Sequence, residues 1–402
     1  MSYEPRISTL AAALLAAFGT TIQIPVQAAM IIVTDTGDSG SASTCTLRQA
    51  IVSMNAGAVA GTGCTYSGPA FGSSDTIAFS TTAFPNGSAN NTITLASGPL
   101  SITAANLAIE AAPNGSITID AHQASPVMVD SVSGGSLSLD HLSLTNGAAT
   151  TGFGGGIGGS STSRLTLTHS TLSGNSASLG GGIYGGYVTL TNCTLSGNSA
   201  NYGGGIWIRG ASNVTGSTLS GNSASKAGGG IYTVGALTLT NSTLSGNSAQ
   251  SSTLGGGGIF VGSSNSLTLT NVTISANSAV SYGAGIFGNG QGQVAITANN
   301  SIVAGNTSLS TLTTADVYPG ITTGLDDLIG SNPKLGPLAN NGGPTRTMLP
   351  LPGSPAIDNG NDATCAASPV NGVDQRGVPR PQGARCDIGA VETDTIFANG
   401  FE

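Results

Sequence analysis

Hydrophobic and polar residues alternate along most of this chain in short runs. Between Leu165 and Leu172 every second residue is apolar or small, and the parity changes between Leu167 and Ser170. A period of two is typical of β-strands, and a corner near Thr168 would let two short strands direct their apolar residues into one interior. The pattern therefore predicts short strands joined by tight corners.

These strands belong to a unit that repeats every 23 to 30 residues. The segment SGNSA begins at Ser173, Ser196, Ser220 and Ser245, with variants at Ser275 and Ala304. A GGGI or GAGI segment ends at Ile157, Ile183, Ile206, Ile231, Ile259 and Ile286. One unit holds three short strands and cannot bury its apolar face alone, so it must stack on copies of itself. We expect an all-β fold, a right-handed parallel β-helix in which one chain winds through about ten coils over residues 77–312.

The two ends of the chain differ from the repeats. Proline is absent between Pro126 and Pro319, whereas ten of the 17 prolines lie between Pro319 and Pro381. At the front, Leu47, Ala50, Ile51 and Met54 share one face of a helix, which predicts a short capping helix within residues 29–76. We expect residues 313–392 to form an irregular C-terminal cap and residues 393–402 a terminal tail.

The composition and the N-terminus indicate export. Charged residues make up 7% of the chain and the net charge is −8, so nucleic acid is excluded as a partner. Arg6 precedes an apolar run from Leu10 to Phe18, which predicts a signal peptide over residues 1–28 and an extracellular or outer-surface location. A membrane anchor is the alternative, although the run is short for a bilayer span. We expect no transmembrane segment in the mature chain.

The five cysteines fall into two local pairs and one single residue. Proximity pairs Cys45 with Cys64 and Cys365 with Cys386 as disulfides, which an exported protein permits. Cys193 occupies a position that other units fill with Ser170, Ser217, Ser242 and Val272, so we interpret it as a small inward residue.

Two residue types recur at fixed positions of the unit. The SGN turns contain Asn175, Asn198, Asn222, Asn247, Asn277 and Asn306, which we expect to stack as a structural ladder. The residues after the GGGI isoleucines include Tyr184, Trp207, Tyr232, Phe260 and Phe287. Alternation would direct these rings outward as a stripe that binds sugars or a protein surface; rings that only stabilise the coils are the alternative.

Charged residues avoid the coils and gather in the tail. No Asp or Glu occurs from His141 to Ala315, and the cations of that span are Arg164, Arg209 and Lys226. The tail contains Asp358, Asp362, Asp374 and Asp387 together with Arg376, Arg380 and Arg385. We interpret this group as ion pairs that fix the cap, with a calcium or catalytic site as the alternative. No catalytic residue, metal site or cofactor is predicted.

Three stretches resemble known families of exported bacterial proteins. CTLRQAIVSMNA, from Cys45, resembles the CSLREA-type N-terminal motif. The GGGI and LSGN repeats resemble the GGAI and FxxN repeats of polymorphic outer-membrane proteins, with leucine at Leu172, Leu195, Leu219 and Leu244 where that family often has phenylalanine. GSPAIDNG, DQRG and CDIGAVE in the tail resemble the choice-of-anchor Q domain. The resemblance implies a secreted or surface-attached β-helix and assigns no catalytic residue.

Two functions remain open at this point. The first is a non-catalytic secreted or cell-surface scaffold, adhesin-like or binding matrix and glycan, whose partner is a polysaccharide or a host or cell-surface protein. The second is a carbohydrate-active enzyme, a polysaccharide lyase or glycosidase of pectate-lyase-like fold, because that fold also hosts enzymes.

Overall fold

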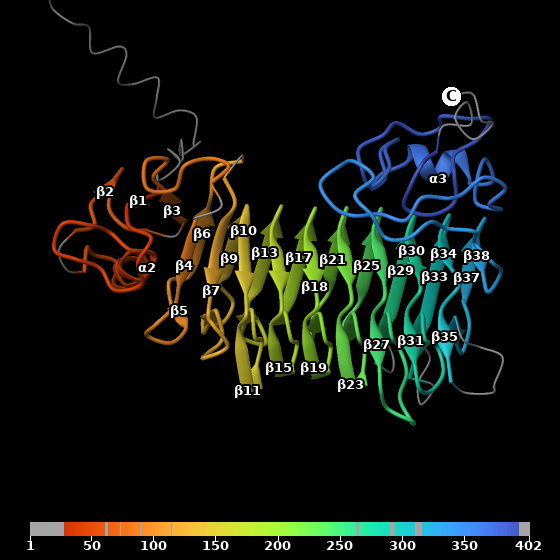
Figure 1. The fold of residues 1–402 in the computed structure, drawn as a ribbon, viewed down its shortest axis with the longest axis horizontal. Coiled ribbons are helices and arrows are strands. Elements are labelled where there is room, and N and C mark those ends of the chain that lie inside the picture. Colours follow the sequence, from red (N-terminus) through yellow and green to blue (C-terminus); the bar gives the residue numbers. More distant parts are fainter. Residues whose placement is uncertain are drawn as a thin grey trace, which may run out of the picture.

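Four sheets wind around one apolar core to form a parallel β-helix (Figure 1). The computed structural model describes residues 28–60, 63–72, 74–88, 91–113, 115–262, 265–289, 294–309 and 316–393. Nearly all of the predicted signal peptide and terminal tail, residues 1–27 and 394–402, lies outside the described residues.

Two of the sheets are long. The twelve-stranded sheet contains β1 (Met30–Val33), β2 (Tyr66–Ser67), β3 (Asp75–Phe79), β6 (Asn106–Glu110), β9 (Ser136–Asp140), β13 (Arg164–Thr168), β17 (Tyr187–Thr191), β21 (Ser212–Thr215), β25 (Leu237–Thr240), β29 (Ser266–Thr270), β33 (Ala295–Asn299) and β37 (Thr323–Leu325). The ten-stranded sheet contains β4 (Thr92–Thr94), β7 (Ile117–Asp120), β10 (Leu142–Thr145), β14 (Thr171–Ser173), β18 (Thr194–Ser196), β22 (Thr218–Ser220), β26 (Thr243–Ser245), β30 (Thr273–Ser275), β34 (Ile302–Val303) and β38 (Leu328–Ile329).

The other two sheets close the coil. The seven-stranded sheet contains β11 (Ala148–Phe153), β15 (Ser176–Leu179), β19 (Ser199–Tyr202), β23 (Ser223–Ala227), β27 (Ser248–Ala249), β31 (Ser278–Ala279) and β35 (Thr307–Ser308). The nine-stranded sheet contains β5 (Leu100–Ile102), β8 (Met128–Asp130), β12 (Ile157–Gly158), β16 (Ile183–Gly185), β20 (Ile206–Ile208), β24 (Ile231–Thr233), β28 (Ile259–Val261), β32 (Ile286–Gly288) and β36 (Val317–Tyr318).

A complete coil has four strands where the sequence predicted three. Among the described residues, seven coils from β9 to β36 carry all four strands, the two before them carry three, and the last carries two. The additional strand is the one that follows the SGN turn, such as β15. Its first three residues, Ser-Ala-Ser, include no large apolar residue and only the last, Leu179, is one, so the strand lacks the alternating hydrophobic pattern. In-register pairing with the neighbouring coils makes it a strand.

Parallel pairing in register keeps equivalent side chains in columns. Leu167 pairs with Leu190, and Leu190 with Val214, along the twelve-stranded sheet. These residues and their equivalents on the other sheets are buried in one continuous cluster. Burying a large aliphatic side chain contributes about 1.5–3 kcal/mol, so each coil shelters its neighbour's apolar side.

The predicted N-terminal helix is present as α2 (Leu47–Ala56) at the front end of the β-helix (Figure 1). Thr46 and Gln49 form a capping box, which satisfies backbone N–H groups of the first turn. Arg48 pairs with Asp38 at 2.8 Å and donates to the carbonyl oxygens of Gly98 and Pro99. The residues that carry the CSLREA-like resemblance therefore fix the helix against the first coils.

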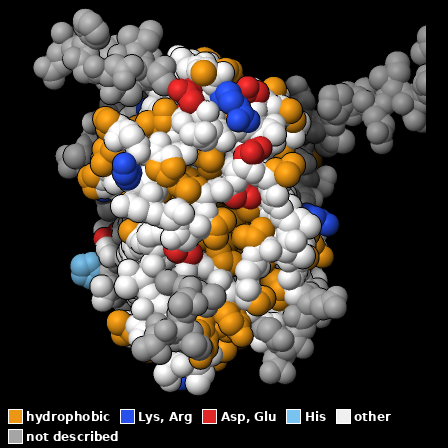
Figure 2. All heavy atoms as spheres, turned by 90° about the vertical axis from the view of Figure 1, so that its right-hand side faces the viewer, with side chains coloured by type: hydrophobic (Ala, Val, Ile, Leu, Met, Phe, Trp, Pro, Cys, Tyr) orange, Lys and Arg blue, Asp and Glu red, His pale blue; other side chains and the backbone are white. Residues whose placement is uncertain are grey.

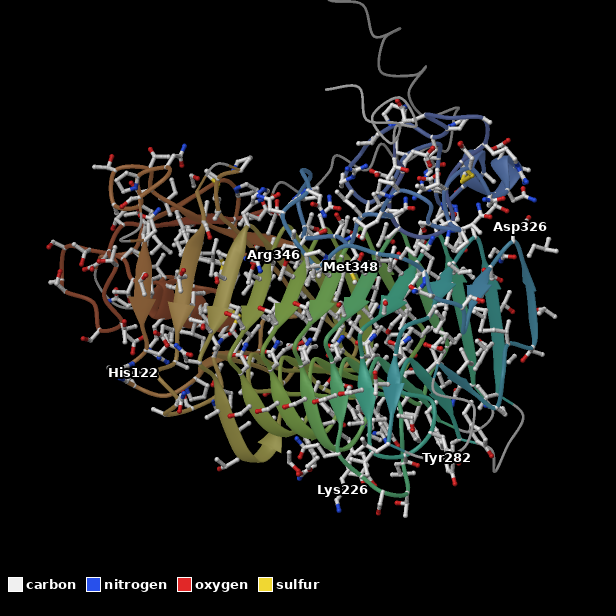
Figure 3. All side chains as sticks on the ribbon, turned by 45° about the vertical axis from the view of Figure 1, so that its right-hand side comes forward. His122, Lys226, Tyr282, Asp326, Arg346 and Met348 are labelled. Carbon is white, nitrogen blue, oxygen red and sulfur yellow. A yellow bond between two sulfur atoms is a disulfide. The ribbon has the colours of Figure 1, made fainter. Side chains whose placement is uncertain are left out.

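The C-terminal segment is irregular as predicted. It lies along the flank of the β-helix and does not close the open end of the last coil (Figure 1). Its only described helix is α3 (Asp362–Ala366). Figure 3 shows Arg346 and Met348 beside the coils, and the Arg346 carbonyl accepts a hydrogen bond from Thr218 on β22. Seen from the end of the last coil, charged side chains gather mainly in the upper half and apolar ones lie exposed at the centre (Figure 2). Leu325, at this end, is 63% exposed.

The segment follows one corner of the β-helix, where the twelve-stranded sheet turns into the ten-stranded one. The residue at this corner is left-handed in each coil from β9 onward, with φ between 44° and 60° at His141, His169, Asn192, Gly216, Asn241, Asn271, Asn300 and Asp326. Thr345 donates to the Gly216 carbonyl, the Asn241 amide donates to Val373, and the Asn271 amide contacts Cys365 Sγ. The C-terminal segment thus covers this corner from Gly216 onward.

Candidate functional site

The asparagine ladder is present and buried. Asn222 donates from its backbone and from its amide to Asn247 Oδ1, at 3.1 and 2.9 Å, and its amide also donates to the Leu195 carbonyl at 2.9 Å. The same three bonds recur at Asn175, Asn198, Asn247, Asn277 and Asn306. At the last rung an aspartate, Asp316, accepts in place of an asparagine. Every ladder amide forms hydrogen bonds with the neighbouring coils, so we assign the ladder a structural role.

The aromatic residues form a continuous stacked column. Tyr184 and Trp207 lie 4.7 Å apart between ring centroids, and Tyr232 and Phe260 lie 4.6 Å apart. The column also includes two rings that the sequence pattern did not single out, Phe153 at one end and Tyr318 at the other.

The rings that the sequence pattern singled out point out of the main core but are largely covered, whereas Phe153 at the end of the column is 52% exposed. Trp207 is 9% exposed and Phe260 is 2% exposed, and Tyr184 and Phe287 are also buried. Residues at the ends of strands of the seven-stranded sheet, such as Tyr202 on β19 and Ala227 on β23, pack over them in a second small cluster. The expectation of an exposed stripe is therefore wrong, because the unforeseen fourth strand covers it. The column offers little surface to a sugar or a protein.

Both predicted disulfides form, between Cys45 and Cys64 and between Cys365 and Cys386. Cys193 is the free cysteine, fully buried in the core cluster. Burial raises the pKa of its thiol to about 12, which keeps it protonated and unreactive.

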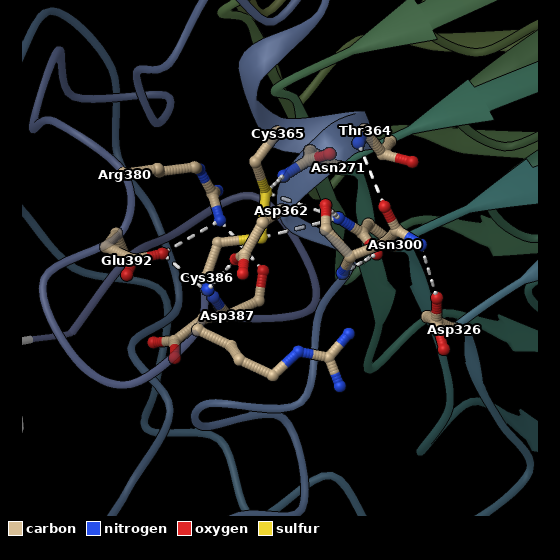
Figure 4. Close-up of a disulfide and its surroundings, with 12 residues drawn as sticks. Asn271, Asn300, Asp326, Asp362, Thr364, Cys365, Arg380, Cys386, Asp387 and Glu392 are labelled. Atoms are coloured by element: carbon tan, nitrogen blue, oxygen red, sulfur yellow. Dashed lines mark hydrogen bonds and ion pairs between the residues drawn. A yellow bond between two sulfur atoms is a disulfide. The ribbon is translucent and has the colours of Figure 1, made fainter.

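The acidic and basic residues of the tail form an internal network around the Cys365–Cys386 disulfide (Figure 4). Arg380 pairs with Glu392 at 3.2 Å, with both side chains fully buried, and Arg376 pairs with Asp374 at 2.7 Å. Glu392 was not among the predicted members of this group. Backbone N–H groups donate to the predicted aspartates Asp358, Asp362, Asp374 and Asp387.

Burial dominates the titration of this network. Burial lowers the pKa of Arg380, although the nearby carboxylates of Glu392 and Asp374 act in the opposite direction. Burial also raises the pKa of Asp387 and of Glu392. Each carboxylate accepts hydrogen bonds from the loops that it joins, so the group is built to hold loops together. This geometry matches the structural interpretation of the cluster.

A cavity of about 550 Å³ lies in the C-terminal segment. Its wall is mainly apolar, from Leu349, Leu351, Ile357 and Val378, with Glu392 among the polar lining residues. Because Glu392 already accepts hydrogen bonds from Gln382 and Asp387, the cavity presents few free polar groups.

The outward face of the twelve-stranded sheet is a flat array of hydroxyl groups. One row runs in register through Thr166, Thr189, Asn213, Thr238, Thr268, Thr297 and Thr323. Beside it stands Tyr187, 37% exposed, with the Arg164 guanidinium 4.8 Å from its ring centroid. From the sequence, threonine was expected only to favour extended strands. The recurrence of these threonines at equivalent positions of successive repeats is the pattern that could have revealed the row.

One group of metal-ligating side chains lies on the uncovered part of the corner. Asp140, His141 and His169 each place a ligand atom within 4.8 Å of the others. Asp140 Oδ1 lies 2.8 Å from His141 Nδ1 and 3.5 Å from His169 Nδ1, and the two imidazole rings stack at 4.6 Å. The hydrophobic pattern and the motifs did not indicate this group, because the two histidines lie in different coils.

Comparison with known proteins supports the fold alone. None of the helices in the described part of the chain is long and apolar enough to cross a membrane. A search of curated proteins and a search of solved structures each found no match. Residues 155–318 match the family model described as right handed beta helix region. The coils of this chain therefore form a right-handed parallel β-helix, as the repeat predicted.

Proposed function

We propose that the protein is an exported, non-catalytic scaffold whose threonine-lined sheet face binds a neutral polysaccharide outside the cell. The observation that carries the proposal is the in-register row of hydroxyls from Thr166 to Thr323. Strands of successive coils lie about 4.8 Å apart, so the row repeats a donor and an acceptor at a constant interval. A polymer with hydroxyls at regular intervals is the natural complement of such a surface.

A non-catalytic role is supported by the state of the carboxylates. Glycoside hydrolysis requires two carboxyl groups on opposite sides of a bound sugar. The described coils from His141 onward carry none before Asp316, and the tail aspartates accept hydrogen bonds from their own loops. Asp374 and Asp387 are buried, so the network would have to open before either of them could act on a substrate.

Export is supported by two disulfides and by the family-like motifs. We place the chain among exported β-helix proteins of the CSLREA and choice-of-anchor Q type. The motif residues have structural tasks that suit a shared framework. Gln375 of the DQRG stretch is buried between Thr218, Thr243 and Thr345, where it joins the C-terminal segment to the coils.

The binding test uses residues 29–402 on an array of neutral and acidic polysaccharides. Thr238→Glu should weaken binding by about tenfold, because it sets a hydrated charge in the middle of the row. Asn201→Glu, an exposed position on β19 of another sheet, should bind as the native protein does. Retention of no polysaccharide, retention of acidic polysaccharides only, or equal binding by both variants would contradict the proposal.

The enzyme alternative is tested on the same panel by assaying for new reducing ends and for unsaturated uronates. We expect no turnover. Turnover that disappears in Asp358→Ala or Asp374→Ala would replace the scaffold proposal with a carbohydrate-active enzyme that uses the tail carboxylates.

A further inference from the structure

We propose that Asp140, His141 and His169 bind a divalent transition-metal ion of the zinc class at the uncovered part of the corner. Two imidazole nitrogens and one carboxylate oxygen form a donor set that suits zinc and its neighbours, whereas calcium and magnesium prefer oxygen ligands alone. Nothing in the polysaccharide-binding proposal depends on this site.

Histidine is unusual at this corner. The position is left-handed in each coil from β9 onward, and four of these coils place an asparagine there: Asn192, Asn241, Asn271 and Asn300. Asparagine is among the residues that adopt this conformation most readily. The backbone therefore does not require histidine, yet two successive coils carry it, directly beside Asp140, the last acidic residue before Asp316.

Two polar atoms of the group are buried without a hydrogen-bond partner among the described residues. These atoms are Asp140 Oδ1 and His141 Nδ1. They lie 2.8 Å apart, but the angles between them are not those of a hydrogen bond. An unsatisfied buried polar atom destabilises the fold, and a cation bound to both atoms would remove that penalty.

The distances between the three ligand atoms are close to those around a single ion. Zinc lies about 2.0–2.2 Å from nitrogen and oxygen ligands, so two ligands of one ion are at most about 4.4 Å apart. The three ligand atoms already lie within 4.8 Å of one another. The His169 side chain is 38% exposed and has to turn out of its stack on His141 to direct a ring nitrogen at the same ion.

A neighbouring residue can orient one ligand. The Asn192 amide nitrogen, Nδ2, lies 3.2 Å from His169 Nε2. Turning this amide by 180° places Oδ1 there, and that oxygen then accepts the Nε2 hydrogen and leaves the Nδ1 lone pair for the metal. Hydrogen bonds of this kind commonly fix the tautomer of a metal-binding histidine.

The position of the site indicates what the ion does. The C-terminal segment hydrogen-bonds the corner from Gly216 onward and does not reach β9 and β13. An ion held by Asp140 and His141 on one coil and by His169 on the next would join these two coils where the segment leaves them uncovered. Three protein ligands leave a coordination position for water or an external group.

The test measures zinc binding to tag-free residues 29–402 by titration calorimetry, with cobalt absorption as a second readout. We expect one equivalent of zinc to bind and to raise the melting temperature. His141→Asn, His169→Asn and Asp140→Asn should each weaken binding by about tenfold or more. Asparagine is chosen for the histidines because other coils carry it at the same corner position.

His122→Asn is the matched control, since His122 is also left-handed (φ 51°) but lies outside the group. It should bind zinc as the native protein does. The proposal is overturned if the native protein binds no zinc, if His141→Asn and His169→Asn bind as tightly as the native protein, or if the site prefers calcium.

Discussion

The coils and the C-terminal segment hold themselves together in opposite ways. Residues 141–309 contain no carboxylate, and their polar groups are stacked amides and hydroxyls that bond to identical groups one coil away. Residues 316–393 contain eight carboxylates and five Lys or Arg residues, and their loops are fixed by buried ion pairs and a disulfide (Figure 4).

This difference indicates that a repeating structure can satisfy its polar groups with neutral side chains, where an irregular one uses ion pairs. A repeating unit always finds its hydrogen-bond partner at the same position of the next coil, so neutral groups suffice. An irregular segment has no such copy, and its loops need charge-assisted bonds to specific backbone groups. If the two regions are separate kinds of structure, a substitution in one of them should leave the stability of the other unchanged.

The largest effect is expected from Arg380→Ala. It leaves Glu392 buried without its cation, which costs about 3–5 kcal/mol. Hydrogen exchange should rise sharply in residues 344–393 and remain slow in the coils. The double variant Arg380→Met with Glu392→Gln removes both charges and keeps an acceptor for one of the two N–H groups, of Gln382 or of Asp387, so it should recover part of the protection. Equal loss of protection in the coils would contradict the separation of the two regions.

A somewhat smaller effect is expected from Asn222→Ala in the middle of the ladder. The change removes the partners of the Leu195 carbonyl and the Asn198 N–H, both buried, at a cost of about 2–5 kcal/mol. The urea midpoint of the coils should fall. Asn201→Ala, whose hydrogen bonds are exposed, should change stability by only about 0.5 kcal/mol. Similar midpoints for the two variants would show that the ladder does not stabilise the coils.

The pH dependence of the last coil should be weaker still. Burial and, less strongly, the charge of Asp326 raise the pKa of Asp327 to about 6, against a backbone hydrogen bond from Ser301 that lowers it. Because the folded pKa lies above the unfolded value of 3.8, the folded state holds the proton more tightly, and stability falls as pH rises from about 4 to 6.

Asp327→Asn keeps an oxygen for the Ser301 N–H and removes this titration. The melting temperature of the native protein should drop more between pH 5 and pH 7 than that of the variant. Since Asp387 and Glu392 titrate in the same direction, the quantity to compare is the difference between the two proteins. Parallel pH profiles would contradict the assignment to Asp327.

The smallest effect is expected at Cys193. With its thiol buried and protonated, iodoacetamide at pH 8 should leave the folded protein unmodified, whereas the unfolded protein should be alkylated at this residue. Cys193→Ser should change stability by less than about 1 kcal/mol, because Ser170 and Ser217 fill the same position in adjacent coils. Rapid labelling in the folded state, detected by mass spectrometry, would show that the core opens at this coil.

Much of the coil could be predicted because its determinants are local and repeated. Leu165 and Leu167 show the strand period, the SGN turns give the coil length, and the asparagines at that interval must stack once the strands pair in register. Helix α2 and its disulfide could be predicted for the same reason, since the capping residues and both cysteines lie close together in the chain.

The tertiary structure alone decided the candidate sites. The exposure of Trp207 depended on a strand without hydrophobic pattern, and the course of the C-terminal segment depended on Gln375 meeting threonines more than 130 positions earlier. Asp140, His141 and His169 come together only through the register between β9 and β13. Sequence determines which residues repeat; contacts between coils, set by register and by burial of side chains from distant segments, determine which of them meet.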